Sequence, residues 1–326
     1  MKAVSLFSGG LDSQLAVCLI QKQGITVTGI NFVTPFFGAR QATLDAAKAL
    51  DIELLTVDIS ADYLINVLKN PVYGFGKNMN PCIDCHAFML RNARKIMDDI
   101  GASFLITGEV LGQRPMSQNR SALNAVDKLS GQKGLIVRPL SGRLLGPTIP
   151  ENEGWIERDM LLDISGRSRK RQMELADEFK IKEYPSPAGG CLLTEANYSQ
   201  RLKYLLTIRP DAKSAELSIL SWGRHFSIDD NLLIIGRNQA ENMNLQKAAL
   251  PGDLLLEARD YPGPLALLRT AGTKEPDLEY VSAIVARYCD GKNQDSVTVN
   301  IYSSDGSINY AIKAEPLDPN NIPAML

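Results

Sequence analysis

The sequence predicts an α/β protein with a parallel sheet, followed by a smaller β-rich α+β domain. Residues 1–110 alternate short apolar runs with amphipathic stretches, and a glycine turn at Ser8–Ser13 joins the first run to the first stretch. After Cys191 the composition changes to short β-like runs separated by Asp-Asp, Pro-Gly and Asp-Gly turn signals. We therefore expect two domains, residues 1–198 and residues 199–326.

The alternating pattern assigns strands and helices to the first domain. Strands are expected at Ala3–Phe7, Thr26–Phe32, Glu53–Val57, Phe104–Thr107 and Leu135–Leu140. Helices are expected at Asp12–Gln21, Ala39–Leu50, Asp62–Leu68, Asp84–Ile100 and, as one or two charged helices broken at Ser165-Gly166, within Glu157–Lys180. Such βαβ units imply a Rossmann-like sheet that binds ligands at the carboxyl ends of its strands. Asn31 and Phe32 would then lie near an adenine, and Gly108 and Glu109 would border the same crevice.

The second domain is expected to begin with a polar helical connector, Gln200–Leu220. Five strands follow, at Asn231–Gly236, Asp253–Ala258, Leu265–Arg269, Ser296–Tyr302 and Ile308–Ala314.

Composition narrows the class of protein. The chain has 326 residues, of which 44% are apolar and 22% charged, as in soluble globular proteins of two domains. No apolar stretch approaches the length of a membrane span, and Met1-Lys2 leads directly into a strand, so we expect a cytoplasmic protein without a membrane partner. A net charge of -2 argues against a uniformly basic nucleic-acid binder but is compatible with a local basic face. Five cysteines, an odd number, argue against a disulfide framework and leave metal or sulfur chemistry open.

The run Ser8-Gly9-Gly10-Leu11-Asp12-Ser13 places free backbone N–H groups at a helix N-terminus, which forms a cradle for pyrophosphate. No Gly-Lys-Ser/Thr follows, so a Walker-type grip is missing. The run resembles the PP-loop of the ATP pyrophosphatases, which release AMP and pyrophosphate. This resemblance implies a domain of the adenine nucleotide alpha hydrolase type that binds ATP along Gly9 and Gly10. It also implies that Asp12 helps hold Mg²⁺ and that Ser8 and Ser13 contact phosphate. The alternative is an ordinary glycine turn with a Ser/Asp helix cap.

Three cysteines form the second candidate centre. Cys82 and Cys85 are spaced as CxxC at the start of a predicted helix, whose N-terminus stabilises thiolate. Cys191 follows glycines in Pro187–Cys191 that permit close approach to a ligand. Three such ligands suit a 4Fe-4S cluster with one iron left open to hold a sulfide. The competing interpretations are a persulfide relay through Cys85 and Cys191, and structural coincidence. His86 directly follows Cys85, which makes joint zinc ligation awkward, and is interpreted as a helix-surface residue.

Further segments resemble tRNA 4-thiouridine synthases and related tRNA 2-thiouridylases, namely Thr107–Gln113, Ser117-Gln118 and Arg138-Pro139-Leu140. The CxxC with a distant cysteine resembles the cluster-dependent branch of tRNA thiolases. The resemblance implies that ATP adenylates a uridine carbonyl in tRNA and that sulfur then replaces the oxygen, giving 4-thiouridine in preference to 2-thiouridine. The sulfur would arrive as sulfide or from a sulfur-donor protein such as a cysteine desulfurase. We expect neither the N-terminal tRNA-binding module nor the rhodanese domain of long 4-thiouridine synthases.

Two regions are candidates for RNA contact. Ile235–Leu245, with Leu250–Asp253 and Tyr261–Pro264, resembles the RNA-binding domain of NFACT-type ribosome quality-control proteins. Its alternative is a β-domain with ordinary Asn and Gly turns. The cations expected to contact RNA phosphates are Arg167, Arg169, Lys170 and Arg171, unless they form a solvated helix face paired with nearby acids.

Two further functions remain open at this level. A non-catalytic RNA-binding factor with structural ATP would bind tRNA without Asp12 or the cysteines. An amide-forming enzyme would need an ammonia source, and no glutaminase-like segment is present.

Overall fold

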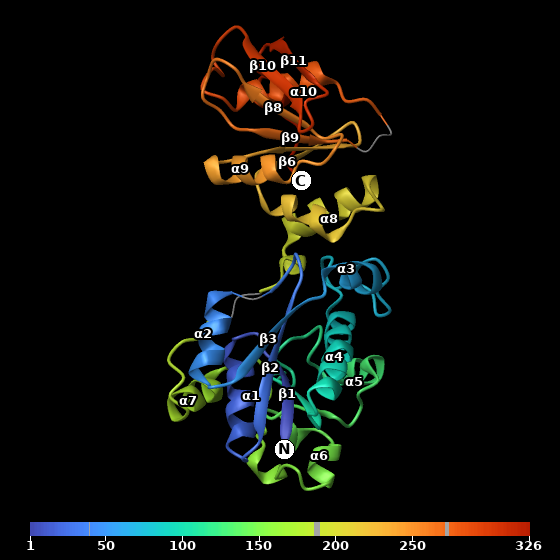
Figure 1. Ribbon diagram of the computed structural model, residues 1–326, viewed down its shortest axis with the longest axis vertical. Coiled ribbons are helices and arrows are strands. Elements are labelled where there is room, and N and C mark those ends of the chain that lie inside the picture. Colours follow the sequence, from blue (N-terminus) through green and yellow to red (C-terminus); the bar gives the residue numbers. More distant parts are fainter. Residues whose placement is uncertain (39, 186–189, 271–273) are drawn as a thin grey trace. The chain divides into compact units, whose positions relative to one another are not determined.

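The computed structural model describes residues 1–38, 40–185, 190–270 and 274–326. The chain divides into two compact units, Met1–Thr194 and Glu195–Leu326 (Figure 1). The division lies just before α8 (Ala196–Ile208), a continuous helix of the second unit, whereas the sequence pattern placed it after residue 198. The expected helix start at Ala39 and the run Pro187–Gly189 lie outside the described residues.

The first unit is built on five parallel strands in the order β3-β2-β1-β4-β5, which confirms the predicted Rossmann-like sheet. The strands are β1 (Lys2–Leu6), β2 (Thr26–Val33), β3 (Glu53–Asp58), β4 (Phe104–Thr107) and β5 (Ile136–Val137). The order reverses at β1, which pairs with β2 on one side and β4 on the other. A reversal of this kind opens a crevice outside the carboxyl ends of the strands.

Helices cover both faces of this sheet, which is why β4 has three consecutive apolar residues and is buried at all four positions. The helices are α1 (Leu11–Gln21), α2 (Gln41–Ala49), α3 (Ser60–Tyr63), α4 (Cys82–Asp99), α5 (Arg120–Ser130), α6 (Ile149–Asn152) and α7 (Lys170–Glu178). Figure 1 shows α1, α2 and α7 on one side of the sheet and α4 and α5 on the other. The expected helix Asp62–Leu68 is instead the end of α3 continued by a π-helical turn, η1 (Leu64–Leu68).

The segment expected to be helical from Glu157 to Lys180 is mostly not. Only α7 is α-helical, and a single 3₁₀ turn, η3 (Arg158–Met160), precedes it. The backbone N–H groups of Leu162 and Ile164 instead donate to carbonyls of residues 139 and 140, so the chain runs extended along that segment. Backbone bonds to a neighbouring segment thus replace the bonds that a helix would have made.

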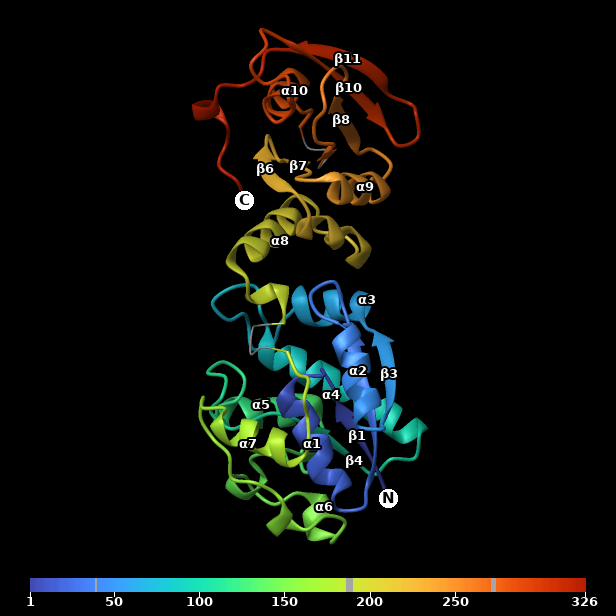
Figure 2. The same ribbon diagram turned by 90° about the vertical axis from the view of Figure 1, so that its left-hand side faces the viewer.

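The second unit contains a six-stranded antiparallel sheet in the order β11-β10-β8-β9-β7-β6. The strands are β6 (Arg224–Ile228), β7 (Asn231–Ile235), β8 (Leu254–Ala258), β9 (Ala266–Arg269), β10 (Val297–Ser303) and β11 (Asn309–Ala314). The other elements are α9 (Gln239–Lys247), α10 (Leu278–Arg287) and the 3₁₀ segments η5 (Ser214–Ser221) and η6 (Pro319–Asn321). Figure 2 shows α10 against one face of this sheet, and the two enclose the hydrophobic core of the unit.

Sequence reasoning found five of these six strands and missed β6. No helix among the described residues has both the length and the apolar character needed to cross a membrane.

Candidate functional site

The glycine turn lies at the switch point of the sheet, directly after β1. Gly9 has a left-handed φ of +74°, and a Cβ there would stand 2.8 Å from the Cα of Thr43. Gly9 therefore satisfies both a backbone and a packing requirement that a larger residue could not meet. Gly10 is the N-cap of α1, and the Ser13 hydroxyl donates to its carbonyl oxygen at 2.8 Å. Ser8 is exposed beside this turn, so the loop presents backbone N–H groups and a hydroxyl to solvent.

Asp12 lies in the first turn of α1, and one of its two carboxylate oxygens has a hydrogen-bond partner. Its Oδ2 accepts a hydrogen bond from Gln113 Nε2 at 3.1 Å, and its buried Oδ1 has no partner among the described residues. Burial raises the pKa of Asp12, while Gln113, Arg169 and Gln172 oppose the rise. An unpartnered carboxylate oxygen beside a phosphate-type loop is the donor that a hard cation such as Mg²⁺ requires.

The wall opposite this loop is formed by the segment after β4. Gly108 lies so close to the PP-loop that a Cβ would stand 2.6 Å from the carbonyl carbon of Asp12 and from the nitrogen of Ser13. Only glycine fits this contact without displacing backbone. The structure thereby brings two predicted site segments, 8–13 and 107–109, into direct contact.

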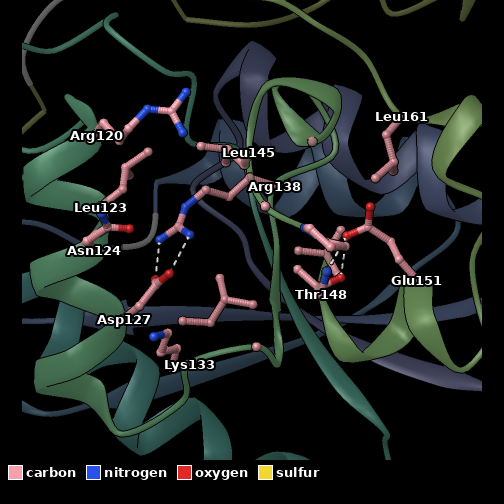
Figure 3. A pocket seen from close by; sticks show the side chains of 16 residues that line it. Arg120, Leu123, Asn124, Asp127, Lys133, Arg138, Leu145, Thr148, Glu151 and Leu161 are labelled. Carbon is pink, nitrogen blue, oxygen red and sulfur yellow. Dashed lines mark hydrogen bonds and ion pairs between the residues drawn. The ribbon is translucent and has the colours of Figure 1, made fainter.

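Glu109 is buried, and the protein itself uses both of its carboxylate oxygens. Oε1 accepts from His86 Nδ1 at 2.7 Å, and Oε2 accepts from Arg138 Nε at 2.8 Å and from the Thr107 hydroxyl at 3.1 Å. Burial alone would raise the pKa of Glu109, but Arg138 and His86 lower it to about 2. Arg138 in turn donates to both oxygens of Asp127, as Figure 3 shows. The sequence analysis assigned His86 to the helix surface, whereas it is half-buried in this network.

A pocket of about 190 Å³ has Arg138 in its lining (Figure 3). Its lining contains none of the residues that the sequence analysis assigned to the nucleotide or the cysteines.

The predicted adenine residues lie at the end of β2. Asn31 Nδ2 donates to the carbonyl oxygen of Phe7 at 2.8 Å, and its buried Oδ1 has no partner among the described residues. Phe32 has a buried side chain. Asn31 therefore ties the carboxyl ends of β1 and β2 together and leaves one acceptor at the crevice.

The cysteines meet around a buried tyrosine that the sequence analysis did not single out. Cys82 and Cys85 occupy the first turn of α4, and Leu192, next to Cys191, donates its backbone N–H to the carbonyl oxygen of Phe36 at 3.0 Å. The ring of Phe36 packs on Tyr63 with a centroid distance of 5.9 Å. The segment that carries Cys191 is thereby brought to the same aromatic cluster as α4.

Tyr63 is fully buried, and its hydroxyl makes no geometrically regular hydrogen bond among the described residues. Burial raises the pKa of the Cys85 thiol, and the neighbouring Cys191 and Cys82 raise it further. The Tyr63 hydroxyl lies close enough to Cys85 to stabilise the thiolate, which opposes this rise. Burial, followed by the neighbouring Cys85, likewise raises the pKa of Tyr63. The three thiols thus all act on the buried Tyr63 hydroxyl, and Cys82 and Cys191 both act on Cys85.

The three thiols and the Tyr63 hydroxyl are the donors available to the metal group that the sequence predicts. Within the described residues, no three His, Cys, Asp or Glu side chains are close enough to hold a single metal ion. A mononuclear site is therefore not preformed. A cluster places a separate iron at each cysteine, so its ligands surround several atoms rather than one, and three thiols around an unsatisfied hydroxyl fit that requirement in number and chemistry.

The four predicted RNA cations separate in the structure. Arg171 forms ion pairs with Glu174 at 3.1 Å and Glu178 at 3.0 Å on the exposed face of α7. Arg169 instead acts on the carboxylate of Asp12, and its Nε is buried. Arg167 and Lys170 are exposed. Arg169 is thus associated with the nucleotide crevice and Arg171 with neighbouring acids.

Gln113, the last residue of the segment Thr107–Gln113 that the sequence analysis singled out, and Gln172, which sequence reasoning missed, flank Asp12. Gln172 is fully buried, and neither of its amide atoms has a partner among the described residues. No local pattern reveals such a residue, because its position depends on α7 folding back onto α1.

In the second unit the Gly-Arg-Asn turn is organised by Glu241. This carboxylate accepts from the backbone N–H groups of Gly223 at 3.1 Å and Arg237 at 2.8 Å, and it pairs with the Arg237 guanidinium. Asn238 caps α9 by accepting from Glu241 N at 3.0 Å. The motif that carried the resemblance therefore has a structural role in shaping the turn.

A parallel sheet with a glycine loop at its switch point defines the first unit as a PP-loop domain. Residues 1–143 match the family model described as thiamine biosynthesis protein (ThiI), and residues 223–325 match the one described as NFACT protein RNA binding domain. The chain thus joins a ThiI-type PP-loop domain to a domain of the NFACT RNA-binding type.

Two curated relatives each match less than half of this chain. A probable tRNA sulfurtransferase of Ureaplasma urealyticum serovar 10 is 31% identical over 144 residues, which is 43% of this chain and 36% of the relative. A tRNA sulfurtransferase of Desulfurococcus amylolyticus is 29% identical over 149 residues, 43% of this chain and 30% of the relative. Among solved structures, a 4-thiouridine synthetase–RNA complex with bound ATP is similar at 23% identity and a TM-score of 0.39, over 67% of this chain and 52% of that one. The chain spans about a third of the length of the curated relatives it matches.

Proposed function

We propose that this chain uses ATP to thiolate a uridine of tRNA, with 4-thiouridine as the favoured product and 2-thiouridine as the alternative. One observation carries the proposal: the helix with the CxxC and the PP-loop both contact segment 107–109, through His86 and Glu109 on one side and Gly108 and Asp12 on the other. Phosphate chemistry and sulfur chemistry are therefore supported by neighbouring parts of one crevice. The sulfurtransferase names of the relatives agree with this assignment.

The reaction proceeds in two balanced steps. The uridine carbonyl oxygen attacks the α-phosphorus of ATP, so that an O–P bond forms and pyrophosphate leaves. Sulfide then forms a bond to the ring carbon, the C–O bond breaks and AMP leaves with the oxygen, with no change in oxidation state. In the persulfide alternative, attack of the second thiolate releases the transferred sulfur to the base and leaves a Cys85–Cys191 disulfide, which a thiol reductant must reduce before the next cycle. Adenylation is required because a carbonyl oxygen is a poor leaving group, whereas AMP departs readily.

The residues of the first step are those of the loop. Backbone N–H groups at the start of α1 stabilise the charge that develops on pyrophosphate, with Ser8 and Ser13 as additional hydroxyl donors. Asp12 would hold Mg²⁺ through its unpartnered oxygen, and Arg169 adds positive charge on the same side. Asn31, Phe32 and Gly108 would line the place of the nucleoside.

The residues of the second step are the cysteines. A 4Fe-4S cluster held by Cys82, Cys85 and Cys191 would supply an iron with an open position for sulfide. A persulfide relay through Cys85 and Cys191 is the alternative. A cysteine desulfurase or free sulfide is the proposed sulfur source, and the NFACT-type unit is the proposed additional tRNA contact.

The proposal is tested by mass spectrometry of tRNA nucleosides from cells with and without the gene. Loss of one thionucleoside supports it, and an unchanged set of thionucleosides contradicts it. Release of pyrophosphate from ATP by the purified chain should depend on tRNA and should fall on Asp12→Asn.

The two sulfur mechanisms are separated by Cys82→Ser in an anaerobic preparation. The cluster mechanism predicts that the variant loses its iron, its visible absorbance and its thiolation activity together. An active variant that lacks iron would exclude it. Cys18→Ala, at a cysteine of α1 outside the site, is the matched control.

A further inference from the structure

The loop that precedes α4, residues 69–81, exposes three large apolar side chains. Val72 is 72% exposed, Tyr73 47% and Phe75 43%. Burying a side chain of this size stabilises a protein by about 2 kcal/mol, so three neighbouring exposed ones forgo a sizeable gain. An exposed group of this kind indicates a surface that meets a ligand or partner.

Asp84, one of the two residues between Cys82 and Cys85, holds the loop in place. The buried carboxylate of Asp84 accepts from the backbone N–H of Val72 at 2.6 Å and of Tyr73 at 3.0 Å. Asp84 is the third residue of the CxxC, so the apolar tip and the thiols share an anchor. The backbone that carries Val72 and Tyr73 is therefore tied to the helical turn that carries Cys82 and Cys85.

A second set of bonds closes the base of the loop. Asn80 Oδ1 accepts from Asn78 N at 3.1 Å, and Asn80 Nδ2 donates to the Cys82 sulfur at 3.3 Å. The Asn78 side chain donates to the carbonyl oxygen of Thr194 at 2.7 Å, near Cys191. The loop is thus tied to the segments of the first and the third cysteine.

The composition of the loop identifies the chemistry of its ligand. Residues 69–81 contain Lys69 and Lys77, three asparagines and no acidic residue, so the aromatic rings are set in a positively charged, hydrogen-bonding surrounding. A planar base on a phosphate backbone matches both features, because rings stack on bases and cations contact phosphates. An apolar protein surface would match the rings alone.

We propose that Tyr73 and Phe75 stack on unpaired nucleobases of tRNA next to the uridine that reaches the cysteines, while Lys77 contacts the backbone phosphate. This inference rests on the proposed tRNA thiolation and adds the element that positions the substrate. A target base inside a helix cannot reach a half-buried sulfur site, and rings beside that site stabilise neighbouring bases once they leave the stack.

The test compares Tyr73→Ala and Phe75→Ala with the conservative Tyr73→Phe in the full chain. We expect each alanine variant to lose roughly ten-fold in tRNA affinity and to raise KM for tRNA more than it lowers kcat, whereas Tyr73→Phe stays near wild type. ATP affinity should be unchanged in all of them. Ile149→Ala is the control, because Ile149 is 40% exposed on α6, at the amino ends of the strands (Figure 1).

Salt dependence separates stacking from charge. Lys77→Ala should reduce the slope of log affinity against log salt concentration by about 0.7, the value for one contact to a single strand. The alanine variants at Tyr73 and Phe75 should weaken binding and leave that slope unchanged. A loss of affinity caused by misfolding would lower ATP binding as well.

Each outcome decides a different claim. Thiolation by variants that bind tRNA as tightly as wild type overturns the loop proposal and leaves the proposed function standing. Weakened binding of a cysteine desulfurase with intact tRNA affinity overturns it in favour of a protein surface. A chain that binds tRNA through the loop but forms no thionucleoside supports the loop proposal and overturns the function.

Discussion

Glu109→Gln should destabilise the first unit by about 3 kcal/mol at neutral pH. The magnitude follows from the pKa of Glu109, which lies near 2 in the folded chain against an ordinary 4.5. Glutamine preserves the shape but removes the charge that faces Arg138 at 2.8 Å and His86 at 2.7 Å. Arg138 keeps Asp127 at 2.7 Å, which limits the loss to the lower part of the range for a broken buried pair.

The assay is urea unfolding followed by the fluorescence of Trp155, in a Trp222→Phe background that removes the tryptophan of the second unit. Trp155 packs on Phe104 in the core of the first unit, so its signal reports that unit. Asp127→Asn is the matched control and should cost less, because that carboxylate is 18% exposed and Glu109 remains paired.

The dependence on pH has a definite sign. Because the pKa of Glu109 is lowered by folding, its contribution is complete above about pH 4.5 and declines as the pH falls toward 2. The difference between wild type and Glu109→Gln should therefore shrink over that interval. Equal stability of the two proteins at pH 7, or a difference that grows on acidification, would refute the reasoning.

Three other substitutions test separate contacts. Gly108→Ala should lower ATP affinity, measured by calorimetry, at least roughly ten-fold, because the added Cβ would stand 2.6 Å from the PP-loop backbone. Gly146→Ala is the control and should leave ATP affinity unchanged, because a Cβ there meets open space. Tyr63→Phe should slow alkylation of Cys85 in the metal-free chain by roughly ten-fold, as located by mass spectrometry, because the hydroxyl that stabilises the thiolate is lost; an unchanged rate would contradict this. Asp253→Asn should destabilise the second unit by about 3 kcal/mol, read from hydrogen exchange of its amides, because its fully buried arginine partner at 2.7 Å is then left with only the more distant Glu216 carboxylate at 4.0 Å; intact protection would argue against the pair.

The parts of the fold that sequence reasoning predicted are those with a strong local signal. β4 was located to the residue because three consecutive apolar side chains and a threonine, bounded by Ser103 and Gly108, are buried on both faces. The PP-loop was located because its glycines are needed for backbone reasons, as the φ of Gly9 shows. β6 was missed because Arg224 and His225 open it, although His225 is buried and burial lowers its pKa to about 3, which keeps the ring neutral.

The contacts that build the candidate site were out of reach for a different reason. Arg138 follows Glu109 by 29 residues, and Asp12 and Gln113 are 101 residues apart. Each of these side chains alone resembles a surface residue, and only the folded sheet reveals that its charge is buried and compensated. Tyr63 carried no signal, because an aromatic residue in an amphipathic stretch is most simply a core residue.

Helix α4 links the CxxC to the wall of the crevice beside the glycine loop, and the sequence alone gives no sign of this contact. Its first turn carries Cys82 and Cys85, and the next residue, His86, donates to Glu109, which follows Gly108 in the wall of the nucleotide crevice. A close-packed interior transmits small displacements rather than absorbing them. A displacement of the PP-loop would therefore be transmitted to segment 107–109 and, through the 2.7 Å contact between Glu109 and His86, to the start of α4. The order of the proposed reaction, activation before sulfur transfer, has in this contact a physical route from the first site to the second.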